Sequence, residues 1–141
     1  MKIFIDANIL VAVVNKEYPL YTYASRVLSW ITANTHQPVT TSVSLAITYY
    51  FAEKKHGASS AKERIALLAD HLIIADCGKT EVTQAATEKK VKDFEDGLQY
   101  FAALNAGCSC LVTENVKDFY FSKIDVLTAK DFLLKMYGGK G

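Results

Sequence analysis

The sequence contains little cysteine and proline and lacks long hydrophobic runs. Three cysteines and two prolines occur among its 141 residues, and an odd cysteine number is not typical of a disulfide-stapled secreted domain. Cys108 and Cys110 are separated by one residue, closer than the spacing in zinc knuckles, so we interpret them as small buried hydrophobic residues. No apolar run approaches the roughly 18 residues of a membrane span, so no membrane association is expected.

The chain also lacks a strong excess of either charge and a recognisable targeting segment. Its formal net charge is +1, which neither requires nor excludes a nucleic-acid partner. The first residues have no basic region ahead of a signal-like apolar stretch, so we expect a cytoplasmic protein. Half of the residues are hydrophobic, which is enough for one domain; we expect it over 1–137, followed by a flexible C-terminal tail at 138–141.

Short apolar segments alternate with helical patterns along the chain. The first segment, Ile3-Phe4-Ile5, is fully apolar, as in a buried parallel strand. The alternation predicts the α/β class, with helices on both faces of a parallel sheet of about five strands. The expected strands are 3–5, 38–41, 72–74, 110–112 and 126–127. The expected helices are 7–15, 21–34, one capped by Ser42 or Ser44 and ending at 56, 61–69, 81–90 capped by Thr80, 93–105, and one capped by Thr128 and ending at 136.

Polar side chains follow several predicted strands or begin the helices after them. Asp6 comes directly after the first strand, where a carboxylate is costly unless it is paired or bound to a metal. Because the carboxyl ends of parallel strands lie at one edge of a sheet, residues far apart in sequence can meet there. Oxygen ligands without cysteine or histidine favour Mg²⁺ or Mn²⁺. The residues concerned are Asp6, Asn8, Ser42, Asp93, Asp96, Thr113, Asn115 and Asp118.

Helix capping is the alternative explanation for several of these residues. Asp93 and Asp96 have the spacing of an N-cap residue and the third helical residue, which suits the helix dipole without any catalytic role. Thr113 is compatible with a simple cap. Single positions therefore do not define a site, and the combination with Asp6 is what points to metal-assisted phosphoryl chemistry.

Three segments of the chain resemble the PIN domain family, which includes the ribonuclease toxins of VapBC-type toxin–antitoxin pairs. The segments are Asp6–Asn8, Asp93–Tyr100 and Thr113–Phe119, in that order. The resemblance implies a three-layer α/β/α sandwich. It also implies a divalent-metal-dependent endoribonuclease that cleaves single-stranded RNA, often as a homodimer, with an antitoxin protein as a partner.

The resemblance also assigns roles to particular residues. Asp6 and Asp96 are implied metal ligands for Mg²⁺ or Mn²⁺, and Asn115 or Asp118 completes the set. Asn8 and Thr113 are implied to orient ligands or water. The implied catalytic set is Asp6, Asp96, Thr113, Asn115 and Asp118, with Asn8, Ser42 and Asp93 as additional candidates.

One position departs from the family pattern. The family usually carries a second acid in the helix after the second strand, and the matching position here is Ile47, beside Thr48. Glu53 lies six residues after Ile47, about 9 Å farther along a helix, and so points elsewhere. Asp93 compensates only if its side chain turns into the cleft. The alternative function is therefore a degenerate PIN domain that binds RNA or a protein without cleaving.

Basic and aromatic residues offer a surface for nucleic acid. Lys92 and Lys117, close to the acidic segments, are expected to hold phosphates, although a solvated helix end explains them equally well. Exposed aromatic rings can stack on unpaired bases, whereas buried ones only fill the core. The aromatic candidates are Tyr18, Tyr21, Tyr23, Tyr49, Tyr50, Phe119, Tyr120 and Phe121.

Two other classes with parallel α/β folds fit the sequence less well. A receiver domain needs paired acids after the first strand, which are missing, although Asp76 follows a middle strand as its phospho-acceptor does. A phosphatase of the haloacid dehalogenase type needs a second aspartate where this chain has Asn8. The sequence therefore favours the metal-dependent nuclease over both.

Overall fold

Five short parallel strands form the centre of the structure, a computed structural model that describes residues 1–138. They are β1 (Lys2–Ile5), β2 (Gln37–Thr41), β3 (Ile73–Ala75), β4 (Cys108–Val112) and β5 (Asp125–Leu127). The strand order is β3-β2-β1-β4-β5, and every neighbouring pair is parallel. Because β1 is central, the carboxyl ends of β2 and β4 flank the residue that follows it, Asp6.

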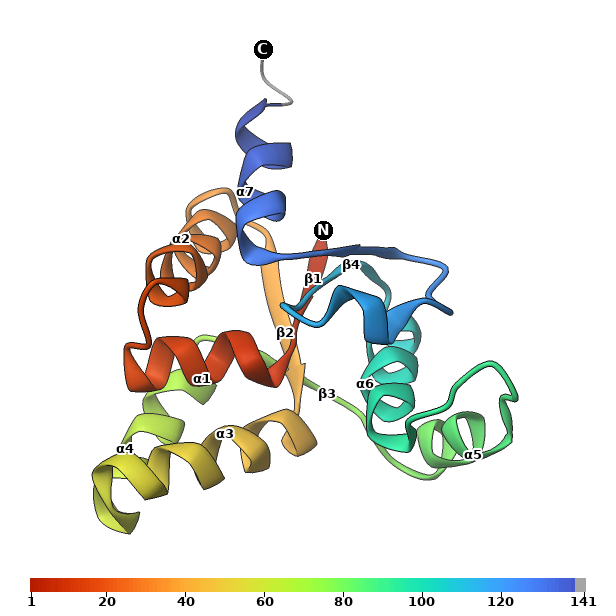
Figure 1. Cartoon of the computed structure of the whole chain (residues 1–141), viewed down its shortest axis with the longest axis horizontal. Helices are drawn as coiled ribbons and strands as arrows, with labels where there is room; N and C mark the ends of the chain where they lie inside the picture. Colours follow the sequence, from red (N-terminus) through yellow and green to blue (C-terminus); the bar gives the residue numbers. More distant parts are fainter. Residues whose placement is uncertain (139–141) are drawn as a thin grey trace.

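Helices cover both faces of this sheet (Figure 1). Ile3 and Ile5 of β1 pack into one core with residues of α1, α2, α3, α4 and α7, whereas Phe4 points to the other core with Tyr100 of α6 and Leu111 of β4. The helices are α1 (Ala7–Asn15), α2 (Leu20–Ala33), α3 (Ser42–His56), α4 (Ala58–Ala69), α5 (Lys79–Thr87), α6 (Phe94–Asn105) and α7 (Ala129–Gly138). The predicted α/β class, parallel five-stranded sheet and three layers are confirmed.

Two predicted N-caps are wrong. Thr41 caps α3 in place of Ser42 or Ser44, because its Oγ1 accepts a hydrogen bond from the Ser44 N–H at 3.0 Å. Helix α5 begins at Lys79 without a Thr80 cap, because the N–H of Gly78 donates to Glu81 Oε1 at 2.8 Å. The N-cap of α3 is therefore Thr41, the last residue of β2, and that of α5 is Gly78. The hydroxyls of Ser42, Ser44 and Thr80 do not cap these helices.

Three helix limits and one short helix also differ from the prediction. Helix α4 begins at Ala58, directly after Gly57 with φ 82°, and α5 ends at Thr87 because Glu88 has extended backbone dihedrals. A 3₁₀ helix, η1 (Val116–Phe119), was not predicted. Gly138, placed in the tail by the sequence, is the last residue of α7, and positions 139–141 of that predicted tail lie outside the described residues.

The cysteines behave as the sequence predicts. Cys108 and Cys110 are buried and unpaired, and burial raises the pKa of the Cys108 thiol to about 11 and that of Cys110 to about 12. Within residues 1–138, no helix combines the length and apolarity needed to cross a bilayer.

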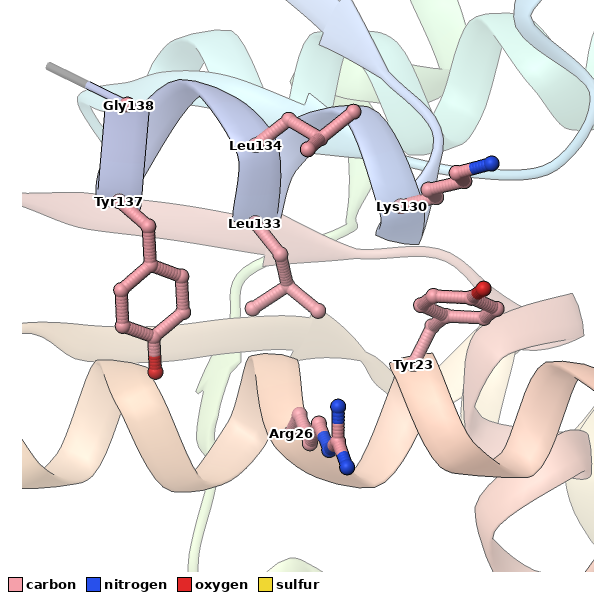
Figure 2. A pocket seen from close by; sticks show the side chains of 7 residues that line it. All are labelled: Tyr23, Arg26, Lys130, Leu133, Leu134, Tyr137 and Gly138. Carbon is pink, nitrogen blue, oxygen red and sulfur yellow. The ribbon is translucent and has the colours of Figure 1, made fainter.

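Helices α2 and α7 lie side by side, and a groove of about 510 Å³ runs between them (Figure 2). Tyr23 and Arg26 of α2 face Leu133 and Tyr137 of α7 across it. This groove is built from helices of the layer that packs on Ile3 and Ile5. It shares no lining residue with the acidic cleft described below.

Candidate active site

A cleft of about 400 Å³ is lined by residues of α1 and α3 on one side and of α6 on the other, close to the carboxyl end of β1. Figure 1 shows where these helices lie. Five of its lining residues are acidic, and among the residues described here neither histidine nor cysteine contributes to its wall. It is lined by Asp6, Ala7, Asn8, Val11, Glu17, Leu20, Ile47, Phe51, Glu95, Asp96, Glu114 and Asn115. Four of the predicted site residues therefore meet in one place: Asp6, Asn8, Asp96 and Asn115.

Asp6 is held rigidly where β1 ends and α1 begins. It is the N-cap of α1, with Oδ1 accepting from the Ala7 N–H at 2.8 Å and Oδ2 accepting from Thr113 Oγ1 at 2.8 Å. Burial raises the pKa of this carboxyl, the hydrogen bonds from Thr113 and Ala7 lower it, and the charge of Asp118 raises it again. The carboxylate is thus oriented before any ligand arrives.

Thr113, directly after β4, connects the parts of the cleft. Its fully buried hydroxyl donates to Asp6 and accepts from Asn8 Nδ2 and from the Asn115 N–H, both at 3.1 Å. Asn8 Oδ1 in turn accepts from the Glu114 N–H at 3.2 Å. These bonds fix the segment after β4 against the start of α1, and they give Thr113 a larger role than the simple helix cap considered above.

Asp96 faces the cleft from the first turn of α6. Its N–H donates to Asp93 Oδ1 at 3.0 Å, so Asp93 is the N-cap that its spacing predicts. Burial raises the pKa of Asp96 to about 7, with further contributions from the charges of Asp93, Asp118, Asp6 and Glu95. Carboxylates from three separate segments therefore repel one another around this residue.

The raised pKa of Asp96, caused by burial and by the neighbouring acids, predicts a pH-dependent stability of the metal-free protein. Because the pKa of Asp96 is raised, the folded state binds more protons than the unfolded state between about pH 4 and about pH 7, so the free energy of unfolding falls as pH rises through this range. We expect the melting temperature in EDTA to fall across it, and Asp96→Asn to remove much of the fall.

Asp131→Asn is the matched control for this measurement. Asp131 occupies the equivalent position in α7, where its N–H donates to Thr128 Oγ1 at 3.1 Å, and it does not line the cleft. Its variant should follow the wild-type curve. Identical pH dependence in wild type and Asp96→Asn would contradict the raised pKa of Asp96.

Several predicted site residues do not line the cleft. Ser42 is exposed as the first residue of α3, and Asp118 is exposed on η1, where its charge still raises the pKa of Asp6 and Asp96. Lys117 is also exposed on η1, and Lys92 lies with its Nζ 5.9 Å from the ring centroid of Tyr120. The two lysines therefore flank the acidic residues without entering the cleft.

The side chain of Ile47 lines the cleft wall where the family pattern places an acid. Thr48 is buried with its hydroxyl donating to the Ser44 carbonyl at 2.7 Å, and Glu53 accepts from the Tyr49 hydroxyl at 2.8 Å outside the cleft. Neither neighbour substitutes for the missing carboxylate, as the helical spacing predicts.

Three acidic residues of the cleft were missed by the sequence analysis: Glu17, Glu95 and Glu114. Glu95 and Glu114 lie beside predicted site residues, so their positions in the matched segments were the available signal. Glu17 follows Lys16, whose left-handed backbone (φ 52°) ends α1 and turns the chain back over the cleft. Glu114 also accepts from the Ala129 N–H at 3.0 Å, which links the cleft to the start of α7.

The donor set of the cleft fits a hard divalent cation. Mg²⁺ keeps several water ligands and is held by one or two carboxylates, and here Asp6 and Asp96 supply two, with the Asn115 amide beside them. Mutual repulsion of the carboxylates is relieved by a cation, which would lower the raised pKa values. Within residues 1–138, no three His, Cys, Asp or Glu side chains are grouped closely enough to form a complete site by themselves.

Comparison with known proteins identifies the class to which this parallel sheet, with an acidic cleft at its carboxyl edge, belongs. A family model described as PIN domain matches residues 2–117. The chain belongs to the PIN domain family. It is VapC-like within that family: Ribonuclease VapC1 of Aquifex aeolicus (strain VF5) is 33% identical in an alignment of 138 residues that covers 93% of this chain and 92% of that protein. The family predicted from the sequence is confirmed.

Two solved structures share the fold at low sequence identity. The structure of VapBC2 from Rickettsia felis, bound to a DNA fragment from their promoter, aligns with a TM-score of 0.67 and 20% identity over 90% of this chain and 97% of that one. Mycobacterium tuberculosis VapC20, described as a Sarcin-Ricin loop cleaving toxin, aligns with a TM-score of 0.59 and 18% identity over 77% of this chain and 86% of that one. At these identities the likeness concerns the fold alone.

Proposed function

We propose that the protein is a divalent-metal-dependent endoribonuclease that cleaves single-stranded RNA and acts as the toxin of a toxin–antitoxin pair. The observation that carries this proposal is the placement of Asp6 and Asp96 on opposite sides of one cleft in a PIN domain chain. The relative named Ribonuclease VapC1 supports the nuclease activity. Metal dependence is supported by the oxygen donor set and by the raised pKa values of both aspartates.

In this proposal Asp6 and Asp96 hold Mg²⁺ or Mn²⁺, and Asn115 or Asp118 completes the set. When bound, the cation supplies Lewis-acid activation of water and neutralises charge on the phosphodiester. Thr113 and Asn8 keep Asp6 in one orientation, since the Thr113 hydroxyl bonds both side chains. Without a cation, the acidic lining of the cleft repels the RNA backbone, so substrate entry depends on metal as well.

Cleavage of a labelled single-stranded RNA by the purified protein tests this function. We expect fragments with Mn²⁺ or Mg²⁺ and intact RNA with EDTA, because the carboxylates alone repel the substrate. Duplex RNA of the same sequence should be cleaved far more slowly. Metal-independent cleavage would contradict the proposed chemistry. Intact RNA under all conditions, with a normally folded protein, would favour the second function below.

The second candidate function is a degenerate PIN domain that binds RNA or a protein without cleaving. The observation that favours it is Ile47, an apolar side chain in the cleft wall where the family usually has an acid. One carboxylate fewer lowers the electrostatic attraction for a divalent cation. The two functions therefore differ in whether the remaining acids bind metal well enough to support cleavage.

Ile47→Glu is expected to strengthen metal binding at least about tenfold, because ligand charge governs affinity for hard cations. The Mn²⁺ concentration that gives a half-maximal rise in melting temperature measures this change. Ala46→Glu is the control, since it adds the same charge to α3 at a residue outside the cleft. Equal effects of the two substitutions would mean that position 47 does not face the metal. Cleavage that appears only in Ile47→Glu would establish the degenerate function.

The proposed partners are single-stranded RNA, an antitoxin protein and a second copy of the chain. The antitoxin is supported by the VapC-like relationship and by the related fold of a VapBC2 complex. A homodimer and a cytoplasmic location stay predictions of the sequence. Light scattering of the protein, alone and co-expressed with the product of the adjacent gene, would measure both assemblies.

A further inference from the structure

A small aromatic pocket is lined by residues of α6, the helix that also carries Asp96, and has no role in the chemistry described above. It has a volume of about 130 Å³ and lies between α6, the segment before it, and the segment that follows η1. Tyr100 lines it, and Phe121 packs edge-on against the Tyr100 ring with centroids 5.1 Å apart. It is lined by Glu88, Lys90, Tyr100, Phe101, Leu104, Phe121 and Lys123.

Exposed basic and aromatic side chains surround this pocket. Tyr120 packs edge-on against Phe121 with centroids 5.3 Å apart, and its hydroxyl donates to the Lys90 carbonyl. The ammonium of Lys92 lies 5.9 Å from the Tyr120 ring centroid. We call Lys90, Lys92, Tyr120, Phe121 and Lys123 the basic aromatic surface; its lysines and Tyr120 are exposed.

Helix α6 contributes residues both to the acidic cleft and to the pocket of the basic aromatic surface. Asp96 lines the cleft, and Tyr100 and Leu104, four and eight residues later, line the pocket. Each four-residue step is about 6 Å along a helix, so the pocket lies one to two such steps from the proposed metal site. Lys92 directly precedes Asp93, and Tyr120 follows η1, which carries Asp118.

The chemistry of this surface matches an unpaired nucleotide. The cleft is rich in carboxylates and repels phosphates, whereas three lysines beside it attract them. Aromatic rings at the same place provide stacking partners for a base, and single-stranded nucleic acid is bound by this combination. Glu88 also lines the pocket; its Oε1 accepts from the Lys90 N–H at 3.3 Å and remains an acceptor for a base amino group.

We propose that the basic aromatic surface is a nucleotide subsite, which binds one unpaired base and its phosphate next to the scissile bond of a single-stranded RNA. This proposal rests on the proposed nuclease function for the location of the scissile bond, but binding itself can be measured without cleavage. Tyr120 stacks on the base, and Lys92 contacts the phosphate.

Fluorescence anisotropy with a single-stranded RNA of about 12 nucleotides tests the subsite, in the Asp96→Asn background with Mg²⁺ so that the RNA stays intact. We expect Tyr120→Ala to weaken binding about 5- to 160-fold, the range for loss of one base–aromatic stack, without changing the salt dependence. Tyr120→Phe keeps the ring and should bind like the parent. Lys92→Ala should reduce the slope of log K against log salt by about 0.7.

Tyr137→Ala and Lys130→Ala are the matched controls. Tyr137 is 59% exposed and Tyr120 is 56% exposed, and both control residues line the distant groove between α2 and α7 (Figure 2). Neither control should alter the affinity for RNA. Melting temperatures of all variants, measured alongside, separate loss of binding from loss of folding.

Single abasic nucleotides placed along the RNA complete the test. The parent protein should bind the RNA more weakly when the abasic nucleotide stands at one particular position. Tyr120→Ala should bind all of these RNAs with the same affinity. Equal affinity of all four alanine variants for the RNA would overturn the subsite. The same holds if polyglutamate displaces the RNA and the position of the abasic nucleotide has no effect on affinity. If the wild-type protein cleaves RNA, and Tyr120→Ala and Lys92→Ala bind RNA as tightly as the parent, the subsite is overturned and the nuclease function stands. If binding depends on the position of the abasic nucleotide but no cleavage occurs, the subsite is supported and the nuclease function is overturned.

Discussion

Asp96→Asn is expected to lower metal-dependent RNA cleavage at least about 100-fold while raising the melting temperature at about pH 8. Loss of residues that only support metal ligands costs 10- to 100-fold, so loss of a ligand should cost at least as much. The stability should change in the opposite direction because burial and neighbouring acids raise the pKa of Asp96, so its negative charge destabilises the folded state. Cleavage rates with Mn²⁺ and thermal unfolding in EDTA measure the two effects.

The opposite signs of these effects separate chemistry from folding. A variant that merely unfolds loses activity and stability together, whereas Asp96→Asn should lose only the first. Asp131→Asn, at the equivalent position of α7, should change neither. Cleavage at the wild-type rate by Asp96→Asn would show that the activity comes from another site or another protein.

The central strand β1 was predictable because it is a short run of apolar residues. Ile3-Phe4-Ile5 is buried on both faces in the structure, as a central parallel strand must be, and so it lacks polar alternation. Once strands alternate with helices, the parallel order and the common carboxyl edge follow from topology. The meeting of Asp6, Asp96 and Asn115 was therefore predictable, although Asp6 lies about 90 or more positions before the other two residues.

Features that depend on single backbone dihedrals or on tertiary contacts were not predictable. Glu17 reaches the cleft because Lys16 adopts a left-handed conformation that its residue type does not require. Thr41 caps α3 although two serines lie close by, because the end of β2 fixes its position. The burial and the charge repulsion that raise the pKa of Asp96 likewise depend on the packing of separate segments of the chain.

Thr113→Val is expected to damage the cleft more than loss of a single buried hydroxyl would. The substitution nearly preserves shape but removes one bond to Asp6 Oδ2, one from Asn8 and one from the Asn115 N–H. Leaving buried polar groups without partners should cost about 1–3 kcal/mol in the free energy of unfolding. Metal-dependent cleavage should fall about 10- to 100-fold, the usual cost of losing a residue that orients a metal ligand.

Thr40→Val is the control that isolates the network from ordinary burial. Thr40 is as fully buried as Thr113, but its hydroxyl makes one hydrogen bond, to the Ile5 carbonyl at 2.9 Å, and it does not line the cleft. Thr40→Val should lose about 1 kcal/mol of stability and little activity.

Because the Thr113 hydroxyl lowers the pKa of Asp6, Thr113→Val should also shift the acidic limb of the pH–rate profile to higher pH. Thr113→Ser, which keeps the hydroxyl, should restore the wild-type profile. A Thr113→Val variant that differs from Thr40→Val in neither rate nor pH profile would reduce the hydroxyl to a packing element, and the orientation of Asp6 would then come from the Ala7 N–H alone.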